Sequence, residues 1–119
     1  MPLFDVFARS ERIGCSALEQ GDPPMGVAAG RFLPEAAYAS VQAAVLASQH
    51  GSQLELALRV VTPDGRELAR DGNVQIVDYS PELGADAIEV QVIGIAPELY
   101  GEWFRTQAAA FQDTLRHTP

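Results

Sequence analysis

Residues 19–32, EQGDPPMGVAAGRF, separate a β-rich start of the chain from its first expected helix. The stretch contains three glycines and a Pro-Pro pair. Proline disfavours the α region for the residue before it, and two adjacent prolines remove two backbone donors from any sheet. We therefore predict a stiff, extended connector at this point, with Gly21 and Gly26 allowing the chain to turn on either side.

Small side chains alternate with larger ones directly after this connector. Gly26, Ala28 and Gly30 share one side of a strand predicted over residues 27–33. A strand face without bulky side chains lets another backbone, a helix or a ligand approach closely. Two interpretations stay open: a loop that binds a ligand or partner, or a rigid crossover whose glycines serve packing. The spacing is not that of a phosphate-binding loop, and the chain has no lysine to contact a phosphate.

Part of the connector resembles a sequence found elsewhere. The segment SALEQGDPPMG, residues 16–26, is similar to a segment of small uncharacterised bacterial proteins of about this length. The resemblance covers only the N-terminal third of the chain. It implies no activity and supplies no catalytic residue.

Length and composition indicate one globular domain. The 119 residues suit a single domain, residues 1–119, with one core. Hydrophobic residues make up 47% of the chain and charged residues 20%, which is an ordinary globular composition. Acidic residues number 16 against 8 basic ones, and the formal charge is −8. This charge disfavours nucleic acid and anionic membranes as partners, and it favours attraction to a basic partner.

The cysteine content and the hydropathy pattern bear on location. Cys15 is the single cysteine, so no internal disulfide is expected, which fits a reducing compartment. No apolar run approaches the ~18 residues of a membrane span. No basic region followed by an apolar stretch opens the chain, so no signal peptide is predicted. A cytoplasmic location is the expectation.

Hydrophobic periodicity predicts six strands and two helices. The strands are expected over residues 3–8, 13–18, 27–33, 53–62, 66–79 and 87–95. Residues 63–65, Pro-Asp-Gly, read as a turn, and residues 71–73, Asp-Gly-Asn, interrupt the fifth strand as a bulge or second turn. The predicted fold is α+β, one mainly antiparallel sheet of about six strands with two helices on one face.

Each predicted helix opens with a Pro-Glu pair. Proline suits a first helical turn, and glutamate suits the positive end of the helix dipole. The pairs lie at 34–35 and 97–98, and Gly101 is expected to delay the second helix until Glu102. Two apolar stripes at helical spacing are expected to face the core. They consist of Ala37, Val41, Ala44 and Val45, and of Tyr100, Phe104, Ala108, Phe111 and Leu115.

The order of predicted elements suggests an internal duplication. Residues 3–50 and 53–116 each read as a hairpin, a further strand and a helix that begins with Pro-Glu. Halves related in this way often leave a cleft between them, where a ligand can bind.

No catalytic or metal-binding constellation is evident. A nucleophilic cysteine needs a nearby base, and the two imidazoles, His50 and His117, lie at a helix end and near the chain end. Cys15 is therefore interpreted as an inert packing residue. No CxxC or HxxxH spacing occurs, so no metal site and no cofactor are predicted.

Carboxylates give the remaining candidates for chemistry. Glu19 and Asp22 flank the connector, which also contains Met25, and they form the best pair for acid–base work. Glu35 and Glu98 would face each other across a cleft if the two helices met there. The alternative is that both only complement their helix dipoles.

Aromatic and basic side chains provide candidates for binding. Tyr38, Tyr100 and Trp103 line either a pocket, a partner surface or the core. Trp103 lies off the main stripe, at the edge of the core or in an interface. Arg31 is one of the cations expected to meet an anionic ligand or an internal carboxylate.

Three functions remain open at this point. The first is a non-catalytic acidic interaction domain of an inhibitor or immunity type, which contacts a protein partner or a second copy through an open sheet face. The second is a small-molecule binding domain with its pocket between the halves. The third is a small hydrolase or isomerase that uses Glu19, Asp22 or Glu35.

Overall fold

The computed structural model describes residues 2–105, and the fold is α+β with antiparallel sheets, as predicted. The strands are β1 (Phe4–Ala8), β2 (Glu11–Ser16), β3 (Gln20–Asp22), β4 (Val27–Arg31), β5 (Leu33–Pro34), β6 (Leu58–Val61), β7 (Glu67–Arg70), β8 (Val74–Asp78) and β9 (Ile88–Val92). The α-helices are α1 (Gln42–Ser48), α2 (Ser80–Leu83) and α3 (Pro97–Trp103). Short 3₁₀ turns are η1 (Pro23–Met25), η2 (Ala36–Ser40), η3 (Leu54–Leu56) and η4 (Asp71–Asn73). Within this part of the chain no helix is long and apolar enough to cross a membrane.

The prediction of one six-stranded sheet is wrong, because the strands form two sheets. The order is β5-β2-β1-β6-β7 in the five-stranded sheet and β3-β4-β9-β8 in the four-stranded sheet. The chain crosses from one sheet to the other at two points, each within a stretch that was predicted as a single strand. Phe32 separates β4 from β5, and its N–H donates to the Ile88 carbonyl at 2.8 Å. Asp71, at φ 53°, turns the chain between β7 and β8 at the predicted interruption.

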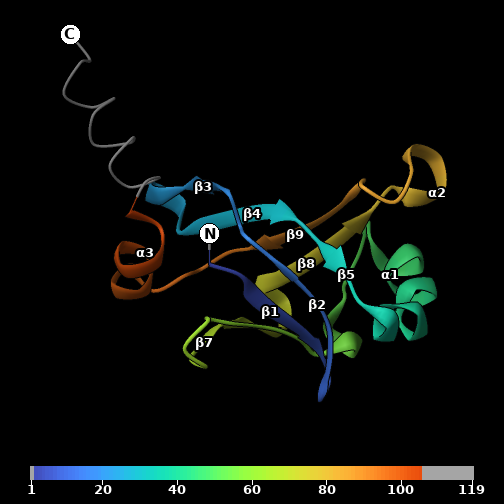
Figure 1. Cartoon of the computed structure of the whole chain (residues 1–119), viewed down its shortest axis with the longest axis horizontal. Coiled ribbons are helices and arrows are strands. Elements are labelled where there is room, and N and C mark those ends of the chain that lie inside the picture. The colour runs from blue at the N-terminus through green and yellow to red at the C-terminus, as the bar shows by residue number, and fades with distance from the viewer. Residues whose placement is uncertain (1, 106–119) are drawn as a thin grey trace, which may run out of the picture.

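The core lies between the two sheets, whose inner faces cover each other. Val6 and Val60 of the five-stranded sheet are fully buried, as are Ile76 and Val90 of the four-stranded sheet. The prediction of two helices on one face is therefore wrong. Figure 1 shows α1 and α3 at opposite ends of the molecule. Because the inner face of each sheet is already covered by the other sheet, the helices bury their apolar sides at the open ends between the two sheets.

The first helix begins later than predicted. Residues after the first Pro-Glu pair form the 3₁₀ turn η2, and α1 begins only at Gln42. Val41 and Val45 are buried, as the stripe predicted, whereas Ala44 is exposed. In the last helix, Gly101 lies within α3, so the expected delay to Glu102 is wrong. The ~1 kcal/mol that a helical glycine costs is outweighed by burial of the flanking aromatic rings. The remaining stripe residues, Ala108, Phe111 and Leu115, lie outside the described residues.

The strand predicted over residues 53–62 is mostly not a strand. It contains η3 and a left-handed Ala57 at φ 47°, and only β6 is extended. Gln53 explains the difference, because its buried amide bonds both backbone groups of Ile76 at 2.8 Å. The glutamine thus closes the free edge of β8 as a neighbouring strand would. Leu54, within the same stretch, is 57% exposed.

The connector is a tight turn and is not extended through both prolines. Asp22 is extended, as predicted, but Pro23 begins η1, and the Gly26 N–H donates to the Pro23 carbonyl at 3.1 Å. Proline's fixed φ suits a 3₁₀ turn as well as extended chain. The small side of β4 does admit a close neighbour, because a Cβ on Gly30 would lie 2.8 Å from the Leu18 Cα.

The two half-repeats, residues 3–50 and 53–116, stay a prediction. Hairpins β1–β2 and β6–β7 lie side by side in one sheet, and hairpins β3–β4 and β8–β9 lie side by side in the other. Any groove along the junction of the two halves therefore draws residues from both.

Candidate functional site

A polar hollow of about 260 Å³ lies where β4 and β9 meet the loop after α2. Both predicted halves contribute to it. It is lined by Glu19, Gln20, Gly30, Arg31, Tyr79, Asp86, Ala87, Ile88 and Glu89.

Carboxylates outnumber the single guanidinium in this polar hollow. Arg31 ends β4, and its guanidinium forms an ion pair with Asp86. Glu19 accepts a hydrogen bond from the Arg31 backbone N–H at 2.8 Å. Glu89 is the register partner of Arg31 on β9. Tyr79, 45% exposed, adds an aromatic ring to the lining. This arrangement disfavours an anion and favours a cation, which can also lie against the tyrosine ring.

An apolar hollow of about 370 Å³ lies at the opposite end of β4 and β9. The η1 turn forms one wall, and the start of α3 forms the other. Burial, followed by the nearby Asp22 carboxylate, raises the pKa of Tyr100, whose hydroxyl donates to the Val27 carbonyl at 3.1 Å. Met25 is 67% exposed. The lining residues are Pro23, Pro24, Met25, Gly26, Ile95, Pro97, Tyr100 and Gly101.

The two hollows divide the residues that were predicted as a site. Glu19 and Arg31 line the polar hollow, whereas Met25 and Tyr100 line the apolar hollow. Asp22 ends β3 at the apolar end, roughly 10 Å of extended chain from Glu19. The structure therefore does not bring the predicted acid–base pair together.

Glu35 also lies apart from both hollows. Its carboxylate forms an ion pair with Arg12, which also contacts Asp5 at 2.9 Å. Glu98 lies in the first turn of α3, at the opposite end of the molecule from α1. The two glutamates therefore do not face each other across a cleft.

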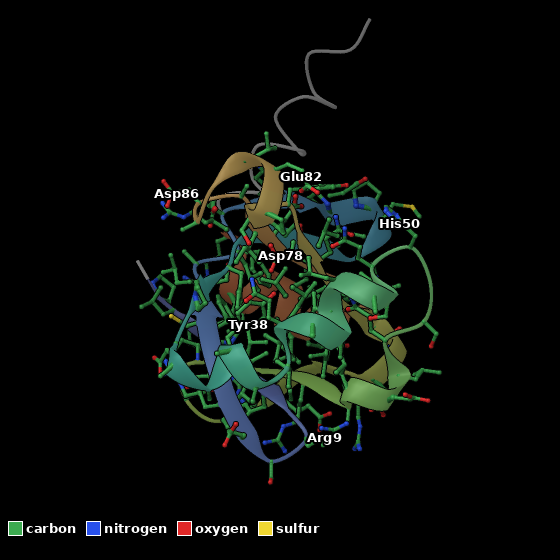
Figure 2. All side chains as sticks on the ribbon, turned by 90° about the vertical axis from the view of Figure 1, so that its right-hand side faces the viewer. Arg9, Tyr38, His50, Asp78, Glu82 and Asp86 are labelled. Carbon is green, nitrogen blue, oxygen red and sulfur yellow. The ribbon has the colours of Figure 1, made fainter. Side chains whose placement is uncertain are left out.

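A buried polar cluster joins η2 and α1 to β8. The Tyr38 hydroxyl donates to the Asp78 carboxylate at 2.6 Å, and the Gln42 amide donates to the same oxygen at 3.1 Å. The Ser80 N–H donates to the other oxygen at 2.8 Å. Figure 2 shows Tyr38 and Asp78 in the interior, away from Glu82 and Asp86 on the α2 loop. Asp78 is fully buried and Tyr38 is 4% exposed, so the cluster holds elements together and offers no surface to a ligand.

Sequence reasoning missed Asp78 and Gln42. The signal that could have identified Asp78 is a carboxylate at the end of an otherwise apolar alternating strand, in phase with Val74 and Ile76. Its partners are far away in sequence, and no local pattern names them.

The pKa values of the cluster follow from burial and hydrogen bonding. Burial alone would raise the pKa of Asp78, but the hydrogen bonds from Ser80, Tyr38 and Gln42 outweigh it and hold the pKa below its usual value. Burial, followed by the hydrogen bond to Asp78, raises the pKa of Tyr38 well above its usual range. The carboxylate and the neutral phenol are therefore the stable forms at neutral pH.

Asp78 should make the free energy of unfolding fall at acidic pH. Its folded-state pKa lies below the unfolded value of about 3.9, so its contribution is complete above that pH and is lost as pH falls through the folded-state pKa. We expect Asp78→Asn to show a smaller loss of unfolding free energy between about pH 5 and pH 2 than the native protein. Urea unfolding at stepped pH measures this. Hydrogen bonds from Arg66 and Thr62 lower the pKa of Asp64, so Asp64 adds a similar dependence on pH. That dependence is the same in the native protein and in Asp78→Asn, so it cancels when the two are compared. Equal pH slopes in the two proteins would contradict the assignment to Asp78.

Other predicted candidates lie in or beside the core. Trp103 packs edge-to-face on Phe4, with ring centroids 5.8 Å apart, and its indole N–H has no hydrogen-bond partner among residues 2–105. Trp103 is partly buried and packs against the core, which is one of the two predicted alternatives. Cys15 is buried in β2, whereas His50 is exposed beyond the end of α1. Over the same residues, no group of three or more His, Cys, Asp or Glu side chains is placed to hold a metal ion.

Comparison with protein-family models, with curated proteins and with solved structures finds no match for this chain. The protein is a small antiparallel α+β protein of two facing sheets, with a polar and an apolar hollow at opposite ends of the smaller sheet.

Proposed function

We propose that this protein is a non-catalytic recognition domain that binds a positively charged segment of another protein at the polar hollow. The observation that carries the proposal is the lining itself, in which three carboxylates, those of Glu19, Asp86 and Glu89, are present with one guanidinium, that of Arg31. The formal charge of −8 adds a long-range attraction for such a segment. Charges of this kind act over a Debye length of about 10 Å at 0.1 M salt.

The surface next to the polar hollow supports a protein partner. Val27 and Ala29 of β4 and Val77 of β8 lie on the outer face of the four-stranded sheet and stay partly exposed. Gln75 and Gln91 lie beside them on the same face, and a surface that mixes apolar and polar side chains is ordinary for a protein interface. A second copy of the chain would carry the same −8 charge and would be repelled, so a basic partner is favoured over a homodimer.

The size of the polar hollow favours one side chain over a cofactor. Its volume of about 260 Å³ is smaller than the ~300–1,000 Å³ of pockets that enclose drug-sized ligands. An arginine side chain of the partner fits this description, because the hollow already accommodates the guanidinium of Arg31 beside Asp86. The same chemistry makes a small organic cation the second candidate ligand.

Binding of a hexa-arginine peptide tests the proposal. We expect binding at 50 mM salt that weakens strongly at 300 mM salt, and a further loss of roughly three- to tenfold in Glu89→Gln or Asp86→Asn. Glu55→Gln is the matched control, because it removes the same charge from an exposed site on η3, outside the hollow. Isothermal titration calorimetry gives the affinities.

The outcomes separate the candidates. Equal losses in Glu89→Gln and Glu55→Gln would show unspecific charge attraction and contradict the site. Absence of binding at low salt would contradict the function. If free arginine at equal concentration stabilises the protein as much as the peptide in a thermal-shift experiment, the small-cation candidate is correct.

A further inference from the structure

We infer that Arg59, on the outer face of the five-stranded sheet, is a binding site for a carboxylate group of a partner protein. Phe7 and Arg59 are partly exposed and alternate along β1 and β6 with the fully buried Val6 and Val60. The guanidinium carbon of Arg59 lies 4.8 Å from the centre of the Phe7 ring, and this contact holds the guanidinium at the surface. The inference is independent of the proposed function, because no residue that lines either hollow belongs to this face.

Three arginines and Phe7 form one row across the outer face. In the register of the sheet, Phe7 is opposite Arg12 of β2 on one side and opposite Arg59 of β6 on the other. Arg59 is in turn opposite Arg70 of β7. Side chains directly opposite one another on neighbouring strands share a face and lie about 5 Å apart. Arg59 therefore lies between the Phe7 ring and a second guanidinium.

The other two arginines of the row already have carboxylate partners. Arg12 contacts Asp5 at 2.9 Å, and Arg70 contacts Glu67 at 3.5 Å. The side chain of Arg59 has no ion pair and no hydrogen-bond acceptor among residues 2–105. Of its guanidinium nitrogens only Nε is buried, so the two Nη atoms reach solvent and can donate to a ligand. Arg59 is thus the guanidinium of the row to which this face supplies no carboxylate.

The surroundings of Arg59 favour a carboxylate that belongs to a protein. A guanidinium binds a carboxylate through two parallel hydrogen bonds. Small-molecule sites are usually concave, whereas Arg59 lies on the face of a sheet beside the partly exposed Phe7 and Val61. The formal charge of −8 repels nucleic acid and other polyanions. The occupant that fits is an extended segment of a partner protein with one acidic side chain between apolar ones.

Titration with a short peptide tests the inference in the native protein. The probe is acetyl-Thr-Val-Asp-Val-Thr-amide, and the control peptide has asparagine in place of the aspartate. The side-chain Nε–H signal of Arg59 in a nitrogen–proton correlation spectrum reports binding, and its loss in Arg59→Gln assigns it. We expect the aspartate peptide to shift this signal and to bind about three- to fivefold more tightly than the asparagine peptide.

Three variants, followed through the backbone amide signals of β1 and β6, separate Arg59 from the charge of the whole face. Arg59→Gln should abolish the preference for the aspartate peptide. Arg70→Gln should retain it, because this variant removes the same charge from a guanidinium that is already paired. Arg59→Lys should retain only part of it, since an ammonium group lacks the planar pair of donors.

The outcomes decide between Arg59 and a general attraction for anions. Equal affinities of the native protein for the two peptides, or equal losses in Arg59→Gln and Arg70→Gln, would overturn the inference. Inorganic phosphate that shifts the Arg59 signal at a lower concentration than the aspartate peptide would show a phosphate site and would also overturn it. A shift of the signal with protein concentration alone would show that a second copy supplies the carboxylate, against a different partner.

Discussion

Replacement of Phe32 by alanine is expected to lower the free energy of unfolding by about 3–5 kcal/mol, the usual cost of removing a buried aromatic ring. Phe32 is fully buried and lies at the point where the chain leaves the four-stranded sheet for the five-stranded one. Its ring packs edge-to-face on Tyr38, with centroids 5.1 Å apart. A Cβ on Gly14 would lie 2.5 Å from the ring, so the ring fills the space above that glycine. Truncation therefore leaves a cavity between the sheets.

The neighbouring residue supplies the control for Phe32. Leu33 is 36% exposed, and Leu33→Ala should cost clearly less, about 1–2 kcal/mol, because part of its side chain is already in contact with water. Urea unfolding followed by circular dichroism measures both variants. Similar losses in the two variants would contradict the central position assigned to Phe32.

Replacement of Asp78 by alanine should be the second most damaging change, at roughly 2–4 kcal/mol, because a buried polar group left unsatisfied costs about 1–3 kcal/mol. Without the carboxylate, the Tyr38 hydroxyl loses its acceptor in the interior, and Gln42 and the Ser80 N–H lose theirs at its margin. The contacts of η2 and of α1 with β8 should both be weakened by this one substitution. Chemical denaturation at neutral pH measures the loss.

Two further variants identify the cause. Asp86→Ala removes a carboxylate whose side chain is 81% exposed, and such a surface ion pair is worth at most about 1 kcal/mol. Tyr38→Phe combined with Asp78→Ala should cost less than the sum of the two single changes, because the phenol no longer needs the acceptor. Additive losses would show that Tyr38 and Asp78 act independently, against the geometry described above.

Local sequence patterns were sufficient for the fold class and for several turns. Alternation identified β1, β6 in part, and β9, and Pro-Asp-Gly at residues 63–65 correctly marked a turn, with Gly65 at φ 89°. The Pro-Glu pair at residues 97–98 correctly marked the start of α3, whereas the pair at residues 34–35 precedes η2, and α1 begins only at Gln42. Glu19, Arg31, Met25 and Tyr100 were chosen from their surroundings in sequence, and the structure places each of them at one of the two hollows.

Only the tertiary structure decided which strands share a sheet. An alternating pattern reports that one face of a strand is buried, but it does not report which element buries it. The passage at Phe32 therefore looked like a continuous strand, Asp71 looked like a bulge or turn within a strand, and Gln53 looked like the start of one. The same reason hid Asp78, since the hydroxyl that supports its carboxylate lies 40 positions away in the chain. Two sheets packed face to face and one sheet covered by helices produce the same alternation in each strand. Contacts between residues that are distant in the sequence decide which of the two folds forms.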